Sequence, residues 1–82
     1  MKRYWHQDYL KAFGKHLREI RLSKNLTQEE LCHRSGLQLS YLGRIERGER
    51  TLTAPLIYTI ATGLGVDQYK LLTFKFKPKK EN

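Results

Sequence analysis

The sequence is poor in cysteine, and this excludes several classes of protein. Cys32 is the single cysteine among 82 residues, so no disulfide can form within the chain, as is typical of proteins in a reducing compartment. Neither Cys32 nor the three histidines show the paired spacing of a structural zinc site. We therefore expect a cytoplasmic protein without a metal or other cofactor.

Long hydrophobic runs and the common catalytic motifs are also missing. The most apolar stretch, Ala54 to Val66, contains a proline and two threonines and is shorter than the ~20 residues that span a bilayer. The sequence has no P-loop, no GxGxxG and no GxSxG motif. We therefore expect neither a membrane protein nor an enzyme. A chain of this length also leaves no room for a separate effector domain, so we expect no small-molecule effector.

Basic residues, by contrast, are abundant. Lys and Arg number 16 and Asp and Glu number 8, which gives a net charge of +8. Because 39% of the residues are hydrophobic, the chain has enough apolar surface to fold and is not a solvated basic tail. This excess of positive charge on a small domain predicts an anionic partner, with nucleic acid first and an acidic protein or a membrane surface second.

The hydrophobic pattern predicts five short helices and no sheet, and so an all-α domain. We expect the first helix to begin at Asp8 as its N-cap and to end near 23–25. Thr27 and Glu30 form a capping box that predicts the start of the second helix, and Gly36 ends it in the left-handed conformation. The remaining helices are expected over about 39–47, from a cap at Thr53 to 65, and from a cap at Asp67 to 72.

The segment 28–47 has the pattern of a helix-turn-helix unit. Two helices that cross steeply need a small residue at the crossing point, which is Cys32, and a glycine in the turn, which is Gly36. Leu42 and Ile45 then return apolar side chains beneath the first of the two helices.

The motifs TQEEL at 27–31, SG at 35–36, YLGRIERGER at 41–50 and GLGV at 63–66 occur in this order. With them, the region from about Phe13 to Val66 resembles the lambda-repressor-like helix-turn-helix family, in its XRE branch of small bacterial and phage regulators, and is similar to restriction–modification controller proteins. The resemblance implies a compact five-helix domain that binds specific DNA sequences, usually as a homodimer on a two-fold-related operator. It also implies a buried ion pair between Arg21 and Glu46.

The second helix of such a unit lies in the major groove, so its outward residues predict the DNA contacts. Arg44 is the best candidate for bidentate recognition of guanine. The expected base-contacting residues are Leu39, Ser40, Gly43 and Arg44, and the expected phosphate-contacting residues are Gln28, Tyr41, Arg47, Arg50 and Thr51. Leu39 is equally consistent with packing in the local core, and Tyr41 with packing against the first helix. Gln38, Leu39 and Gly43 depart from the family pattern, which usually has a capping residue at the first position and polar residues at the other two.

The C-terminal end has apolar residues that the helix-turn-helix core does not need, and we expect them to form a dimer interface: Val66, Tyr69, Leu72, Phe74 and Phe76. From Leu72 on, apolar and polar residues alternate, so an extended segment would place Leu72, Phe74 and Phe76 on one face. Such ends would pair as a ribbon or lie on the partner's fourth and fifth helices. The alternative is a frayed basic tail that adds charge through Lys75, Lys77, Lys79 and Lys80.

These observations predict an N-terminal extension at 1–8, a helix-turn-helix domain at 9–73 and a basic tail at 74–82. The function that they favour is that of a nucleoid-associated transcriptional regulator, a repressor or controller, which binds double-stranded DNA as a homodimer. An antitoxin-like protein-interaction module on the same scaffold is the alternative. It would have no need of the basic residues gathered on one outward face, and its affinity for DNA would show little salt dependence.

Overall fold

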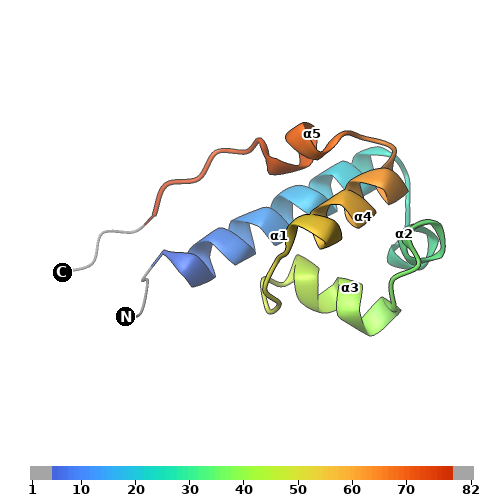
Figure 1. Cartoon of the computed structure of the whole chain (residues 1–82), viewed down its shortest axis with the longest axis horizontal. Coiled ribbons are helices and arrows are strands. Elements are labelled where there is room, and N and C mark those ends of the chain that lie inside the picture. The colour runs from blue at the N-terminus through green and yellow to red at the C-terminus, as the bar shows by residue number, and fades with distance from the viewer. Residues whose placement is uncertain (1–4, 79–82) are drawn as a thin grey trace.

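The computed structural model describes residues 5–78, which form five helices and no strand (Figure 1). The helices are α1 (His6–Ser23), α2 (Gln28–Ser35), α3 (Leu39–Glu46), α4 (Ala54–Leu64) and α5 (Gln68–Leu72). The predicted all-α class is confirmed. Residues 1–4 of the expected extension and residues 79–82 of the expected tail, with Lys79 and Lys80, lie outside the described residues. Between residues 5 and 78, no helix is both long and apolar enough to cross a membrane.

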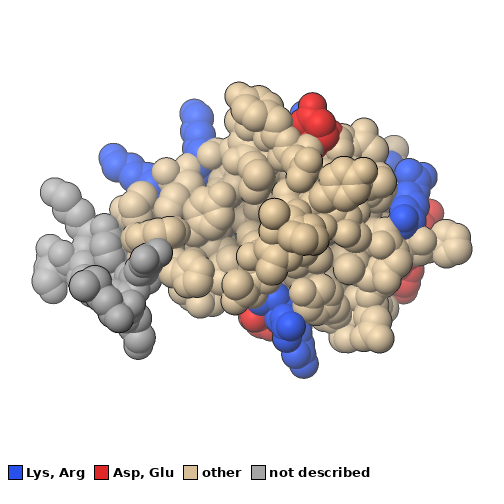
Figure 2. Space-filling view, viewed as in Figure 1, with Lys and Arg blue, Asp and Glu red and all other residues tan. Residues whose placement is uncertain are grey.

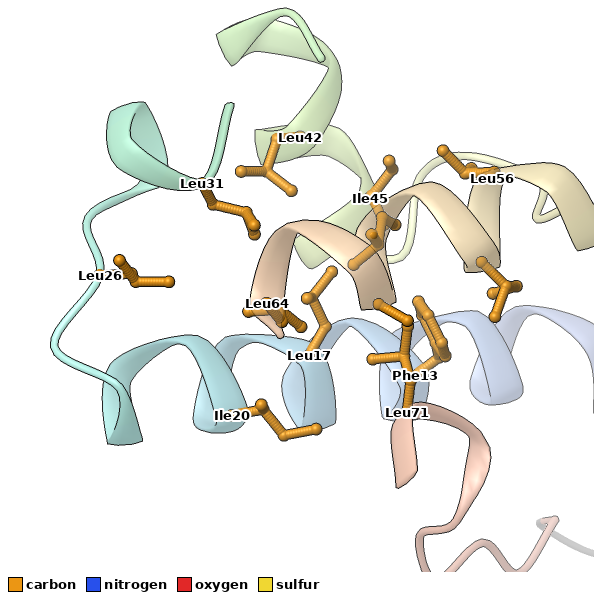
Figure 3. Packing of buried hydrophobic residues seen from close by; sticks show 13 residues of the cluster. Phe13, Leu17, Ile20, Leu26, Leu31, Leu42, Ile45, Leu56, Leu64 and Leu71 are labelled. Carbon is orange, nitrogen blue, oxygen red and sulfur yellow. The ribbon is translucent and has the colours of Figure 1, made fainter. Parts of the chain in front are cut away.

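The hydrophobic core lies where the apolar sides of all five helices meet (Figure 3). Helix α1 packs against α3 and α5, and α2 packs against α3 and α4. The largest fully buried side chains are Phe13, Leu17, Leu31, Leu42, Ile45, Ile60, Leu64 and Leu71. Because α3 contributes to this core through Leu42 and Ile45, its opposite side is left toward solvent.

Most helix starts follow the local signals of the sequence. The Thr53 hydroxyl accepts a hydrogen bond from the backbone N–H of Leu56, and the Asp67 carboxylate accepts one from that of Lys70. The expected cap at Asp8 is wrong, since α1 already begins at His6. The backbone N–H of Tyr9 bonds the Trp5 carbonyl, and the two rings meet edge to face with centroids 6.2 Å apart. This contact adds helix before Asp8.

Helices α1 and α3 cross in direct backbone contact at Gly14. A Cβ atom placed on Gly14 would lie 2.6 Å from the carbonyl oxygen of Ile45 and in still closer contact with that of Glu46. No side chain larger than hydrogen therefore fits at this crossing. The sequence places a small residue at the crossing within the helix-turn-helix unit, Cys32, but gives no sign of this second close approach.

Residues 73–78 run back along α1 without regular secondary structure (Figure 1). The Phe74 ring lies 5.3 Å from that of Tyr9 and 5.1 Å from that of His16, and the Phe76 ring lies 5.1 Å from that of Tyr9. The expectation that Leu72 shares their face is wrong, because Leu72 is the last residue of α5 and is exposed. Both phenylalanine rings thus contact α1 of their own chain.

Candidate nucleic-acid interface

Helix α2 has a defined cap at each end, and its C-terminal cap forms the turn to α3. The Thr27 hydroxyl accepts a hydrogen bond from the backbone N–H of Glu30 at 3.0 Å, and the Glu30 carboxylate accepts one from that of Thr27 at 2.8 Å. These bonds from Thr27 hold the pKa of Glu30 below its ordinary value. At the other end, Gly36 has φ +79° and donates its N–H to the Cys32 carbonyl at 2.8 Å. The predicted capping box and glycine turn are confirmed.

A buried ion pair fixes α3 to α1. Arg21 donates from Nε to Glu46 Oε2 at 2.7 Å and from Nη2 to Glu46 Oε1 at 3.1 Å. It also donates from Nη1 to the carbonyl oxygen of Leu26 at 2.8 Å. The pair that the resemblance implies is therefore present, and its guanidinium also ties down the loop before α2.

Gln28 belongs to the same network, although no local pattern in the sequence predicts this contact. Its amide Nε2 donates to Glu46 Oε1 at 3.0 Å, so Glu46 receives hydrogen bonds from α1 and α2 at once. Gln28 is half-buried at the start of α2. One amide hydrogen is thus used within the protein, and a contact with a phosphate would use the other one or the backbone N–H groups of α2.

The outward side of α3 presents Leu39, Ser40 and Arg44, which are all exposed. Within residues 5–78, no side chain forms a hydrogen bond with the Arg44 guanidinium. Gly43, which we expect to face outward, is buried. The physical reason is Arg47, whose Nη1 lies 3.2 Å from the position that a Cβ atom of Gly43 would take.

The expected phosphate-contacting residues after Gly43 lie around the C-terminal end of α3. Arg47 forms an exposed ion pair with Glu49, and Arg50 stacks its guanidinium over the Tyr41 ring, 4.9 Å from the centroid. Thr51 is exposed, whereas Tyr41 is half-buried and packs against the core. Arg47, Arg50 and Thr51 thus follow α3 closely in the chain, and the guanidinium of Arg50 returns to Tyr41 on α3.

Residues of α1 also contact the loop that follows α3, and no pattern in the sequence predicts these contacts. Gln7 donates from Nε2 to the carbonyl oxygen of Gly48 at 2.9 Å. Gly48 has φ +77°, and a Cβ atom there would lie 2.7 Å from the Cα of Lys11. The loop that carries Glu49 and Arg50 is thereby held against the first turns of α1.

The five residues expected at a dimer interface lie in different environments. Val66 is half-buried and packs on the core, while Tyr69 and Leu72 are 77% and 44% exposed. Phe74 and Phe76 lie against α1, so they do not provide the open apolar face that the prediction requires. Tyr58 on α4, which is not among these five residues, is 60% exposed.

Burial raises the pKa of the Cys32 thiol, and the negative charges of Glu29 and Glu46 raise it further. A raised pKa leaves less of the reactive thiolate, which favours a packing role for Cys32. An exposed helix with guanidinium and hydroxyl groups is suited to binding a polyanion.

Comparison with known proteins gives consistent results. The helix-turn-helix family HTH_3 matches residues 17–67. The uncharacterized HTH-type transcriptional regulator y4dJ of Sinorhizobium fredii is 41% identical over 66 residues, which cover 80% of this chain and 86% of the relative.

Two solved structures of restriction–modification controller proteins are similar in fold. C.AhdI from Aeromonas hydrophila superposes with a TM-score of 0.77 at 42% identity, covering 79% of this chain and 98% of that one. The C.Esp1396I tetramer in complex with its natural 35 base-pair operator gives a TM-score of 0.71 at 35% identity, with 76% and 82% covered.

Proposed function

The chain belongs to the HTH_3 helix-turn-helix family of transcriptional regulators, and we propose that it acts at the nucleoid as a homodimer on a two-fold-related operator. In this role, of the repressor or controller kind, α3 reads base edges in the major groove of double-stranded DNA. The observation that carries the proposal is the outward side of α3, where Ser40 and Arg44 are exposed on a helix whose other side is part of the core.

The hydrogen bonds that hold α3 against α1 and α2 support this proposal. A side chain discriminates between bases only if it is held in a defined position in the groove. Glu46, on the inner side of α3, accepts hydrogen bonds from Arg21 of α1 and Gln28 of α2. Helix α3 is therefore held in position by α1 and α2, while Ser40 and Arg44 remain exposed on its other side.

The distribution of charge supports the binding of DNA at α3 and of a second copy of the chain at a different surface, formed by α4 and α5. Helix α4 contains no charged residue, although the chain has a net charge of +8. Figure 2 shows that uncharged atoms cover the middle of the face that α4 and α5 form, and that Lys and Arg lie toward its edges. Tyr58, Tyr69 and Leu72 are exposed on these two helices.

A second copy is the partner that we propose for this α4–α5 face. One recognition helix contacts only a few base pairs, whereas two helices related by a two-fold axis contact half-sites about 34 Å apart. The similar protein C.Esp1396I is a tetramer on its operator, so this scaffold supports assembly on DNA. In this proposal Tyr58 joins Tyr69 and Leu72 at the interface, and Phe74 and Phe76 remain on α1.

The experiment that tests the proposal is selection of bound sequences from a random duplex pool, with the full chain as bait. We expect enrichment of one sequence with two-fold-related halves whose centres are about one helical turn, or a multiple of it, apart. Retention of all duplexes alike, or no retention at low salt, would contradict the proposal. The second result would favour the protein-interaction module.

A further inference from the structure

Arg47 lies back across the outer side of α3 and does not extend away from it. Side chains of a helix point toward its N-terminal end, so the side chain of residue i covers residue i−4. For Arg47 that residue is Gly43, and Nη1 of Arg47 lies 3.2 Å from the place of the missing Cβ atom. The guanidinium therefore occupies the space that a side chain at position 43 would fill.

Glu49 holds the guanidinium by one of its edges. Arg47 donates from Nε to Glu49 Oε2 at 3.2 Å and from Nη2 to Glu49 Oε1 at 3.3 Å. The two side chains are 59% and 50% exposed, so this pair adds little to the free energy of unfolding. Its physical effect is to reduce the number of conformations open to a long side chain, which lowers the entropy that binding must remove.

The bonds to Glu49 leave the other edge of the guanidinium open. A guanidinium has five N–H donors, and the pair with Glu49 uses one on Nε and one on Nη2. Both hydrogens of Nη1 and the second hydrogen of Nη2 remain. Two parallel N–H donors are what the O6 and N7 acceptors of guanine require in the major groove.

We propose that Arg47, seated on Gly43 and held by Glu49, is a specificity-determining residue that recognises one guanine of the bound DNA. This replaces the phosphate contact expected from the sequence, and it rests on the proposed function. A phosphate is anionic and would meet the Glu49 carboxylate at close range, which is unfavourable. The acceptors of guanine carry no net charge, so the same carboxylate does not oppose them.

Arg47→Lys tests the proposal, because lysine keeps the positive charge and loses the planar pair of donors. With the duplex selected by the wild-type chain, we expect a loss of affinity of about fivefold to 150-fold. One base position should also lose its preference for guanine, while the dependence of affinity on salt is unchanged. Arg34→Lys, at an exposed arginine of α2 outside the predicted DNA contacts, is the matched control and should retain the preference at every position.

Glu49→Gln provides a second test, in which general electrostatics and the proposal predict different changes in DNA binding. If only long-range electrostatics matters, removal of a negative charge should strengthen binding to any duplex. Glu19→Gln, on the surface of α1 beside Lys15 and Phe74, is the control for that effect. We expect Glu49→Gln to weaken the guanine preference at the position that Arg47→Lys affects. Arg34, Arg47 and Glu49 are exposed, so thermal unfolding of the variants should match the wild type.

Two results would overturn the proposal. One is an Arg47→Lys variant that keeps all base preferences of the wild type. The other is a Glu49→Gln variant that binds every duplex more tightly and equally, as Glu19→Gln does. Both presuppose a wild-type chain with sequence preference, so they differ from failure of the proposed function, in which the wild type itself shows none.

Discussion

Arg21 and Glu46, which are 25 residues apart in the sequence, form a two-bond ion pair with side chains that are only 6% and 4% exposed. The pair connects the end of α1 to the end of α3, and Gln28 adds a third hydrogen bond to the same carboxylate. Since Glu46 lies on the recognition helix, the orientation of that helix depends on a buried charge being neutralised. The stability of the fold and the geometry of the interface thus depend on one network.

The first prediction concerns this pair. Arg21→Met leaves the Glu46 carboxylate buried without its cation and should lower the free energy of unfolding by about 3–5 kcal/mol. Urea denaturation at neutral pH measures this change. Arg18→Met removes an exposed arginine of the same helix and should change the free energy of unfolding by less than about 0.5 kcal/mol. A loss for Arg21→Met as small as that of the control would show that the pair contributes no net stability.

The second prediction concerns the crossing of α1 and α3. In an exposed helix, Gly→Ala stabilises by about 1 kcal/mol. At Gly14 the added methyl group would overlap the carbonyl oxygens of Ile45 and Glu46, which are backbone atoms that cannot turn away. We therefore expect Gly14→Ala to destabilise the chain by about 1–3 kcal/mol, as read from thermal unfolding.

Gly43→Ala is the matched control for this prediction. It places the same methyl group in α3 next to the movable side chain of Arg47 alone, and it should not reduce stability. If both variants were stabilised alike, the close approach of α1 and α3 at Gly14 would be refuted.

The contrast between these sites shows which features can be predicted from sequence. Capping at Thr27 and termination at Gly36 involve residues three or four positions apart, so a local pattern encodes them. The Gln28–Glu46 bond and the Gly14 crossing join residues from different helices, and no local pattern marks them. Arg21–Glu46 is equally remote and could be foreseen only through a resemblance to proteins that have it.

The C-terminal segment shows a second limit. Alternation from Leu72 to Phe76 correctly separates the two phenylalanines from the exposed lysines 75 and 77. It does not indicate which surface the phenylalanines cover, because their own α1 and a partner chain would satisfy the same pattern. The structure gives the aromatic rings of Tyr9 and His16 as their neighbours.

The third prediction concerns pH. Hydrogen bonds from Thr27 hold the pKa of Glu30 below its ordinary value, so this carboxylate stabilises the folded chain at pH values above its unfolded pKa. That stabilisation is lost as the pH falls through the folded pKa. Urea midpoints measured from about pH 6 down to about pH 3 should therefore fall less for Glu30→Gln than for the wild type. Parallel curves for the two proteins would contradict the coupling.

The fourth prediction separates the two surfaces that could join two chains. Tyr69→Glu places a charge on the α4–α5 face and should weaken dimerisation by at least about 2 kcal/mol, roughly 30-fold. Phe74→Ala should leave dimerisation unchanged, because Phe74 packs on its own α1. Sedimentation velocity over a range of protein concentrations measures both effects. A monomeric Phe74→Ala variant beside a dimeric Tyr69→Glu variant would place the interface on the C-terminal segment.

The fifth prediction concerns the phosphate contacts. Arg50 lies beyond the recognition helix, stacked on Tyr41. Arg50→Ala should weaken the binding of every duplex alike and reduce the slope of log affinity against log salt by about one unit. Fluorescence anisotropy with labelled duplexes at several salt concentrations measures this slope. An unchanged slope would remove Arg50 from the phosphate-contacting residues.

The most direct measurement of the central claim, that the outward side of α3 reads DNA sequence, compares two duplexes. Affinities of the wild type and of Arg44→Ala are measured for the selected duplex and for a shuffled duplex of the same composition. Lys15→Ala, which removes one charge from the side of α1 near Phe74 and Lys75, is the control. We predict that Arg44→Ala loses about 1–3 kcal/mol on the selected duplex and no more than the control on the shuffled one. Equal losses on both duplexes would contradict base reading by α3.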